Sequence, residues 1–428
     1  MVFRKHDRKL FAGLEASGGS AATIDTTTDY IESSEPTFSI TPLLFERTPK
    51  AGSMTKPVAT VPGTGDLTPV ATVEFGFGME LAGPSADVAA ASNAPRIGTL
   101  LKACGLAETA ALYSVGIGNV AGGPLLNREM ATAGTGPAVF TDTFYDDGTL
   151  YCGEATALSS SAVVGEVSAA TAVATGSTAR VGVGYRFRTD RGDGGVGNSS
   201  ATIRLYLDDN GSYVEGKGMR GTADFTFTHG DRVLVNFTFT GVLNSYVDGG
   251  GVDVTDYTYP TKVPPAFIAP SAGIQVSQTS SDVMSSSLIF NSMTLSLGND
   301  VSVRENTNAA DGYDQGIITG RTPTFGFNPD ATLATTAGNL DFWNSFLSGA
   351  IQRMSFTVGA TVGNKIKFKM PAIQFTGITD GDRDSVMVLD STCNMTGGNY
   401  GSSLLSNGAT TKSNTDLGFD NELAIIFE

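Results

Sequence analysis

Charged side chains are scarce in this sequence. They make up 16% of the 428 residues, compared with about 25% in a typical soluble domain. Ser, Thr and Ala are abundant and there are 53 Gly residues, so small neutral side chains must cover much of the surface. Such surfaces are typical of proteins that are buried in an assembly and of many secreted β-proteins. With 40% apolar residues, the chain is still long enough to bury a sizeable core.

Cysteine and histidine are also rare, which leaves few residues for catalysis. The three cysteines, Cys104, Cys152 and Cys393, are too widely spaced for a disulfide framework or a metal knuckle, and they fit a reducing cytoplasm. The two histidines, His6 and His229, lie in a basic segment and in a predicted turn, so a Ser-His-Asp or Cys-His site has little to draw on. Carboxylates are plentiful, but their clusters stand beside Gly or Asn and indicate turns. We therefore predict no catalytic residue, no metal and no cofactor, in a protein that is not an enzyme.

Two glycine-rich stretches resemble nucleotide-binding loops but lack essential parts. Residues 211–218 match the first seven positions of a phosphate-binding loop, yet Gly218 replaces the hydroxyl residue that holds magnesium. The pattern that follows is that of a strand, whereas phosphate binding requires the N-terminus of a helix. Residues 116–121 resemble a dinucleotide fingerprint but run into Gly-Gly-Pro. Neither stretch predicts a nucleotide site.

Long apolar runs and excess positive charge are absent as well. No stretch of about 18 apolar residues occurs, so we expect no membrane span, and Glu15 interrupts the apolar residues 10–14, so we expect no secretory signal. The net charge of −16 argues against a DNA-binding groove, because such grooves need Lys and Arg to displace counterions from phosphates. This charge is compatible with a protein that lets DNA pass without binding it.

The first ten residues differ from this acidic body. They contain four cations, Arg4, Lys5, Arg8 and Lys9. This basic arm is either a solvated terminus or a segment that docks on an acidic neighbouring subunit.

Alternation of apolar and polar residues dominates the chain and predicts antiparallel β-structure. Residues 224–228 and 233–239 alternate on either side of a turn at 229–231, as in a hairpin with one buried face. Further strands are predicted at 72–77, 293–297, 354–358 and 365–370. The fold class is thus mainly β.

The strand at 365–370 carries lysine at every second position. Lys365, Lys367 and Lys369 face away from the apolar residues between them. Aligned lysines most often mark a solvated or edge-protecting face. The other interpretation is an inter-subunit face at which these lysines form ion pairs.

Two short helices are predicted, at 97–104 and 340–347. Each ends at a glycine, and each follows a strand and a loop rich in Ala and Ser or Thr. An Arg-Thr-Pro tripeptide precedes each unit, at 47–49 and at 321–323. These similar settings favour a tandem duplication, with a Gly/Ala/Ser-rich region at 114–200 between the units.

Several stretches together resemble the tail tube (major tail) proteins of long-tailed bacteriophages, and they occur in the same order along most of the chain. The stretches are residues 10–19, 95–105, 218–227, 235–241, 295–301 and 320–324. The resemblance implies antiparallel β-sandwich or barrel-like tail-tube domains, with one or two short helices and a β/loop insertion. The implied layout is an N-terminal arm at 1–35, the first part of tube domain 1 at 36–113, the insertion at 114–200, the domain 1 hairpin at 201–265 and tube domain 2 at 266–428.

The resemblance also implies a function. Subunits of this family stack as rings around a hollow tube through which DNA passes, without being bound, on its way to the host. The rings would be hexameric, or trimeric with pseudo-sixfold symmetry if the duplication is real. The implied partners are other copies of the chain and the tail terminator, tape measure and distal tail proteins, in a virion that is assembled in the bacterial cytoplasm.

Two other functions stay open at this stage. A capsid-decoration or baseplate protein would share the Gly- and Thr-rich β composition. A secreted carbohydrate-binding β-protein would need exposed aromatic platforms, whereas we expect Trp343, the single tryptophan, to be a core residue of its helix.

Overall fold

The computed structural model describes most of the chain. The described residues are 7–46, 58–60, 70–83, 95–110, 115–116, 128–131, 143–146, 152–158, 162–167, 178–179, 183–188, 199–208, 211–249, 257, 263–268, 275–277, 284–285, 288–309, 311–331, 341–359, 364–396 and 421–427. Within them the protein is mainly β, with antiparallel sheets and two short helices, which confirms the predicted class.

The elements follow one another in this order: β1 (Lys9–Leu14), β2 (Tyr30–Ile31), β3 (Ser34–Pro42), β4 (Leu44–Glu46), β5 (Val58–Thr60), β6 (Ala71–Glu80), α1 (Ile97–Ala103), β7 (Ala107–Ala110), β8 (Val115–Gly116), β9 (Arg128–Ala131), β10 (Thr143–Asp146), β11 (Cys152–Leu158), β12 (Ala162–Val167), β13 (Thr178–Ala179), β14 (Val183–Arg188), β15 (Ala201–Tyr206), β16 (Tyr213–Thr228), β17 (Leu234–Val247), β18 (Gln275–Ser277), β19 (Met284–Ser285), β20 (Ser292–Ser296), β21 (Asn299–Glu305), β22 (Tyr313–Arg321), β23 (Thr324–Phe327), α2 (Phe342–Ser348), β24 (Ile351–Val358), β25 (Ile366–Arg383), β26 (Val386–Met395) and β27 (Asn421–Phe427).

A single 17-stranded sheet forms the body of the molecule. One run of hydrogen-bonded neighbours, here called the eight-strand path, is β3–β6–β17–β16–β20–β23–β26–β25, with every pair antiparallel. The sheet forks at its two longest strands. The first half of β16 also pairs with β15, which leads to β1 and β2, and the first half of β25 pairs with β24 and β27.

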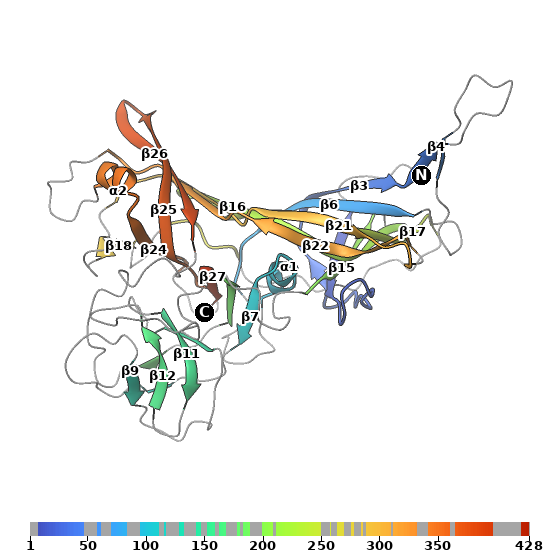
Figure 1. Cartoon of the computed structure of the whole chain (residues 1–428), viewed down its shortest axis with the longest axis horizontal. Coiled ribbons are helices and arrows are strands. Elements are labelled where there is room, and N and C mark those ends of the chain that lie inside the picture. Colours follow the sequence, from blue (N-terminus) through green and yellow to red (C-terminus); the bar gives the residue numbers. More distant parts are fainter. Residues whose placement is uncertain are drawn as a thin grey trace.

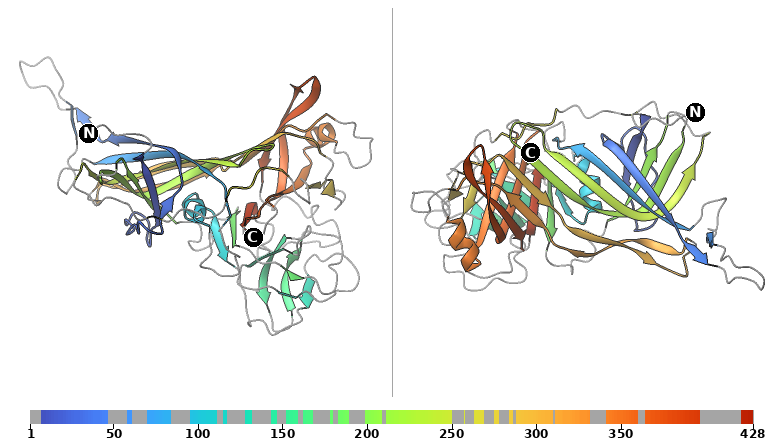
Figure 2. Two further views of the ribbon diagram at one scale, coloured as in Figure 1. Left: turned by 180° about the vertical axis from the view of Figure 1, so that it is seen from behind. Right: turned by 90° about the horizontal axis from the view of Figure 1, so that it is seen from above.

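The views show how this sheet is laid out. In Figure 1, β6, β16 and β17 run along the length of the molecule, while β24, β25 and β26 stand at one end and β3 and β4 lie at the other. Figure 2 shows the long strands side by side in one broad, curved sheet.

Aromatic side chains on one face of this sheet form the core. Phe75, Phe225, Phe237 and Phe239 are almost completely buried, as the period-two pattern predicts, and rings of neighbouring strands stack on one another. Each such side chain stabilises the fold by roughly 1.5–3 kcal/mol through removal of apolar surface from water. The predicted hairpin is confirmed: β16 and β17 pair across a turn that contains Gly230.

Both predicted helices are present. Helix α1 buries Leu100 and Leu101, and Gly105 follows it with φ of 89°. Helix α2 is capped by Asp341, whose side chain accepts a hydrogen bond from the backbone N–H of Asn344, and it ends at Gly349 with φ of 65°. A left-handed glycine after the last turn satisfies free carbonyl groups without a Cβ clash.

The prediction that Trp343 is a core residue is wrong, since its side chain is 48% exposed. Helix α2 buries Phe342, which packs against Phe327 and Phe375 of the sheet. Trp343 is the next residue along the helix and points about 100° away from Phe342. Leu347, one turn further on, is 79% exposed.

Residues 114–200 contribute strands both to a small sheet of their own and to the main sheet. Strands β10, β11, β12 and β9 form a small sheet of their own, which lies below the main body in Figure 1. Strand β14, in contrast, pairs with β7 and with β27 of the main sheet. The predicted insertion therefore includes one strand of the main sheet.

The predicted duplicate units share one sheet. The first tripeptide, at 47–49, lies outside the described residues. The corresponding strands β6 and β23 are both inner strands of the eight-strand path, and the ladder between β16 and β20 crosses the predicted domain boundary at 265.

Candidate functional site

Cross-strand register aligns the outward residues of the eight-strand path into rows. One row takes a residue from each strand in turn: Ser34, Gly78, Asn236, Asp224, Ser296, Thr324, Asn394 and Gln374. Every member of this row is either glycine or a polar residue. Because successive side chains of a strand point to opposite sides, the same alternation that buries the phenylalanines creates this second surface.

We call the whole of this surface the polar face. It comprises Ser34, Thr37, Ser39 and Thr41 of β3; Thr72, Glu74, Gly76, Gly78 and Glu80 of β6; Leu234, Asn236, Thr238 and Thr240 of β17; Thr222, Asp224, Thr226 and Thr228 of β16; Ser292, Thr294 and Ser296 of β20; Thr324 and Gly326 of β23; Asp390, Thr392 and Asn394 of β26; and Gln374 of β25, all exposed or half-buried. Leu234 is its one large apolar member. The face is therefore broad, neutral in most places and rich in hydroxyl groups.

The ionisable residues of the polar face are all acidic. They are Glu74, Glu80, Asp224 and Asp390. Arg232, beside the face in the turn before β17, forms an ion pair of 2.5 Å with Glu80. Asp224 accepts a hydrogen bond of 2.5 Å from the Ser296 hydroxyl. A surface of this kind repels phosphate and offers no cations that could replace the counterions of DNA.

One open hollow interrupts the polar face near β3. It has a volume of about 480 Å³, and its lining includes Ser34, Glu35, Gly76, Gly78 and Asn236. A Cβ on Gly78 would lie 2.7 Å from the Ser34 hydroxyl oxygen, so the lack of a side chain there leaves room for Ser34 to lean across the strand. Glu35 is the single ionisable residue of the lining, and one carboxylate cannot provide the acid and base pair of a hydrolase.

The sheet edges at the two ends of the eight-strand path are open among the described strands. Strand β3 pairs with β6 alone. At the other end, β25 pairs with β24 only as far as Gln374, so its outer edge from 376 to 383 has no strand beside it. Open edges expose backbone N–H and C=O groups to which another chain can bind.

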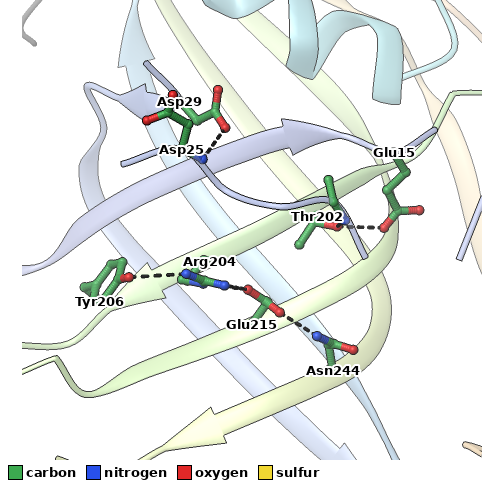
Figure 3. Close-up of polar contacts among 9 residues, drawn as sticks. Glu15, Asp25, Asp29, Thr202, Arg204, Tyr206, Glu215 and Asn244 are labelled. Atoms are coloured by element: carbon green, nitrogen blue, oxygen red, sulfur yellow. Dashed lines mark hydrogen bonds and ion pairs between the residues drawn. The ribbon is translucent and has the colours of Figure 1, made fainter. Parts of the chain in front are cut away.

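A buried carboxylate fixes the N-terminal segment to the sheet. Glu15, just after β1, is 6% exposed and accepts four hydrogen bonds, from the Ser200 and Thr202 hydroxyls and from the backbone N–H groups of Gly19 and Gly218, at 2.6–2.9 Å. Figure 3 shows the hydrogen bond between Glu15 and Thr202, a residue of β15. The sequence contained no signal for this role, because the donors lie about 180–200 residues away in the chain, apart from Gly19.

The same contact uses a backbone donor of the glycine-rich stretch at 211–218. The backbone N–H of Gly218 donates a hydrogen bond to Glu15, so it is not free to bind a phosphate. Strand β16 begins within the stretch, at Tyr213. The prediction that a strand and not a helix follows this stretch is confirmed.

A second polar cluster joins β15, β16 and β17. Arg204 donates to Glu215 at 2.5 Å, and Asn244 donates to the other oxygen of Glu215 at 2.5 Å (Figure 3). Burial alone would lower the pKa of Arg204, but the Tyr206 hydroxyl and the charge of Glu215 outweigh it and the pKa is raised. Glu215 is 4% exposed, so this ion pair is internal and serves the sheet.

The basic arm lies partly within the described residues. Arg4 and Lys5 fall outside them. Arg8 donates to the Pro36 carbonyl at 2.7 Å and stands 6.0 Å from the Phe38 ring centroid, while the Lys9 ammonium is 5.4 Å from the ring centroid of Tyr257. Arg8 and Lys9 are thus half-buried against their own chain, at β3 and beside β2.

The two described lysine side chains of the strand at 365–370 are buried to different degrees. Lys367 is 3% exposed, and Lys365 is half-buried. The side chain of Lys369 lies outside the described part. The interpretation as a solvated or edge-protecting face is wrong at Lys367, because its side chain is buried and because β24 and β27 pair with β25 on both sides there, so that β25 is not an edge strand. A role of these lysines between subunits stays a prediction.

No group of three or more His, Cys, Asp or Glu residues in the described part of the chain is placed to hold a metal ion. None of the helices in that same part is long and apolar enough to cross a membrane. Comparison of the sequence with protein-family models and with curated proteins finds no match.

Proposed function

We propose that the chain is a non-enzymatic structural subunit that polymerises as stacked rings into the hollow tail tube of a long-tailed bacteriophage. The observation that carries this proposal is the polar face, an ordered surface that spans eight strands and whose ionisable side chains are all carboxylates. In the tube this face lines the channel.

The chemistry of the polar face suits a channel for DNA. Duplex DNA binds proteins chiefly through lysine and arginine at its phosphates. Threonine and serine hydroxyls keep a channel wall hydrated, and the carboxylates of Glu74, Asp224 and Asp390 repel phosphate. DNA would therefore pass along such a wall without adhering to it.

The open edges of the sheet support polymerisation. A sheet with an open strand at each end of its path can continue into the sheet of the next copy, and closing the series into a ring removes all bare edges. The ring contains six copies, or three copies if the two similar strand–helix units are tandem tube domains. In both cases the domains are of the sandwich or barrel-like kind.

Electron microscopy tests this proposal directly. The purified chain, concentrated at modest salt, is expected to form hollow tubes of uniform width with a regular axial repeat. End views then distinguish threefold from sixfold rotational symmetry. Monomers at every concentration and salt would contradict the proposal, and discrete closed oligomers without stacking would point to a decoration or baseplate protein.

A labelling experiment tests which surface lines the channel. Thr238 lies in the middle of the polar face and is exposed. In a Thr238→Cys variant with Cys152→Ser, a polyethylene-glycol maleimide should react quickly with dissociated subunits and far more slowly with intact tubes. Equal rates in the two states would show that the polar face is not the channel wall.

A further inference from the structure

The hairpin β25–β26 and the residues beside it carry large apolar side chains that are exposed in the described part of the chain. Met387 is 50% exposed and Ile289 is 64% exposed. The two residues flank one segment, since Ala331 donates its N–H to the Met387 carbonyl and Asp330 donates its N–H to the Ile289 carbonyl, at 2.9 and 2.8 Å. They therefore lie close together on the outside of the molecule.

Carboxylates border these apolar side chains. Asp382 is directly opposite Met387 in the ladder between the two strands, and Asp380 lies two residues earlier on the same face; both are exposed. Asp384 follows in the turn, with φ of 52°. We call Ile289, Met387, Asp380 and Asp382 the hairpin patch. The neighbouring cation, Arg383, is held by an ion pair with Asp330.

An open backbone edge adjoins the hairpin patch. The outer edge of β25 from 376 to 383 has no strand beside it among the described residues. A ligand for this region would combine an extended backbone, an apolar side chain and positive charge.

One segment of the sequence has this composition. Residues 1–6 read Met-Val-Phe-Arg-Lys-His, so that three apolar residues precede Arg4 and Lys5. Two described segments also combine apolar residues with cations, β14 and the start of β25, but each already pairs with a strand on both sides and cannot be added to another edge. Charge and apolar character are thus complementary between this segment and the hairpin patch.

The arm cannot reach the hairpin patch of its own chain. Arg8 is held at Pro36 of β3, and the seven residues before it span at most about 25 Å when fully extended. Seven inter-strand steps separate β3 from β25, which amounts to about 34 Å at roughly 4.8 Å per step. Figure 1 shows β3 and the β25–β26 hairpin at opposite ends of the molecule.

We infer that residues 1–6 of one copy dock on the hairpin patch of a second copy, with Phe3 against Met387 and Ile289 and with Arg4 and Lys5 against Asp380 and Asp382. This contact joins different surfaces of the two copies, so it repeats from copy to copy as polymerisation requires. The inference rests on the proposed function and names the surface that receives the basic arm.

Charge exchange tests the contact in the full-length chain. Arg4→Glu with Lys5→Glu, or Asp380→Lys with Asp382→Lys, should slow assembly by about tenfold as followed by light scattering. Combining the four changes should restore the rate to within about threefold of the original chain, because the pairs are then formed with reversed signs. Asp300→Lys, an exposed acid on β21, is the matched control and should leave the rate unchanged. No recovery in the combined variant would overturn the inference.

Disulfide formation between two kinds of chain separates this contact from the tube itself. One chain carries Phe3→Cys and the other Met387→Cys, both with Cys152→Ser, so that a mixed disulfide joins two copies only. We expect the linked dimer in the mixture and little of it when either variant is oxidised alone.

The outcomes distinguish the two proposals. Tubes without the linked dimer would overturn the docking of the arm and leave the tube proposal standing. The linked dimer in closed, unstacked oligomers would support the docking and contradict the tube. Absence of both dimer and tubes would contradict both proposals.

Discussion

The carboxylate of Glu15 accepts a hydrogen bond of 2.7 Å from the backbone N–H of Gly218, although the two residues are 203 positions apart. This contact and those to Ser200 and Thr202 tie the root of the basic arm to β15 and β16. Burial lowers the pKa of the nearby Arg220, and the charge of Glu15 partly offsets that effect. A carboxylate with four donors is well satisfied, so the arm is anchored at a defined place on the sheet.

Replacement of Glu15 should weaken the fold. Each carboxylate oxygen of Glu15 accepts two hydrogen bonds. In Glu15→Gln an NH2 group replaces one of these oxygens and faces two donors, and the remaining hydrogen bonds are no longer made to a charged group. We expect the free energy of unfolding to fall by about 2–3 kcal/mol. Urea unfolding followed by tryptophan fluorescence measures it. Glu74→Gln, at an exposed site of the polar face, is the control and should change stability by less than about 0.5 kcal/mol; equal effects of the two changes would contradict the anchoring role.

Gly298 should tolerate no side chain. Its φ is 58°, and a Cβ would overlap the carbonyl group of Thr322. Gly230 has a similar φ of 75° but has open space around it. Gly230→Ala should therefore lower the free energy of unfolding by about 1–2 kcal/mol, because alanine must adopt the left-handed conformation there. Gly298→Ala should lower it by about 1–3 kcal/mol more, because its Cβ also overlaps the backbone. Thermal unfolding of the two variants side by side gives the difference, and equal losses would show that the overlap is relieved.

The cap of α2 should be measurable by substitution. Asp341 accepts a hydrogen bond of 2.9 Å from the N–H of Asn344. Asp341→Ala should destabilise the protein by about 1 kcal/mol, while Asp341→Asn, which keeps an acceptor, should cost only a few tenths. Denaturant titration distinguishes these outcomes. A loss as large for Asn as for Ala would mean that the charge, and not the hydrogen bond, stabilises this end of the helix.

The thiols of Cys104 and Cys393 should be inert in the folded protein. Both are fully buried, and burial raises the pKa of each thiol; at Cys104 the charge of Asp224 adds to the effect. Because the thiolate is the reactive form and its fraction falls as the pKa rises, a disulfide reagent at pH 8 should modify these residues only as fast as the protein opens. In a Cys152→Ser chain, colour should develop slowly in buffer and rapidly in guanidinium chloride. Rapid reaction in buffer would show that the sheet opens easily.

Local pattern was sufficient to predict the hairpin of β16 and β17, because alternation places Phe225, Phe237 and Phe239 on one side whatever the rest of the chain does. It was also sufficient for α1 and α2, whose terminal glycines have the left-handed conformation that ends a helix. The polar face was implicit in the same alternation, but its continuity depends on register between strands from distant parts of the sequence. Register cannot be read from any single strand.

Two predictions failed because they concerned the surroundings of a residue. Lys367 alternates like a solvent-facing residue, yet its side chain is buried, and β27, more than fifty residues later in the chain, pairs beside it so that the strand is not an edge. Trp343 has the large aromatic side chain expected of a core residue, yet α2 packs Phe342 against the sheet and leaves Trp343 half exposed. In both cases the burial depends on the tertiary surroundings, which the local pattern does not contain.

The sequence by itself thus determined the class of this protein, its hairpins and helix ends, the absence of cationic excess and the apolar side of each strand, since these follow from composition and from neighbours two to four residues apart. Only the tertiary structure decided which strands adjoin, that outward Thr, Ser, Gly and acidic residues merge into one polar face, and that Glu15 anchors the arm. Those features require segments hundreds of residues apart to meet, and the free energy that brings them together is shared among many contacts across the whole sheet.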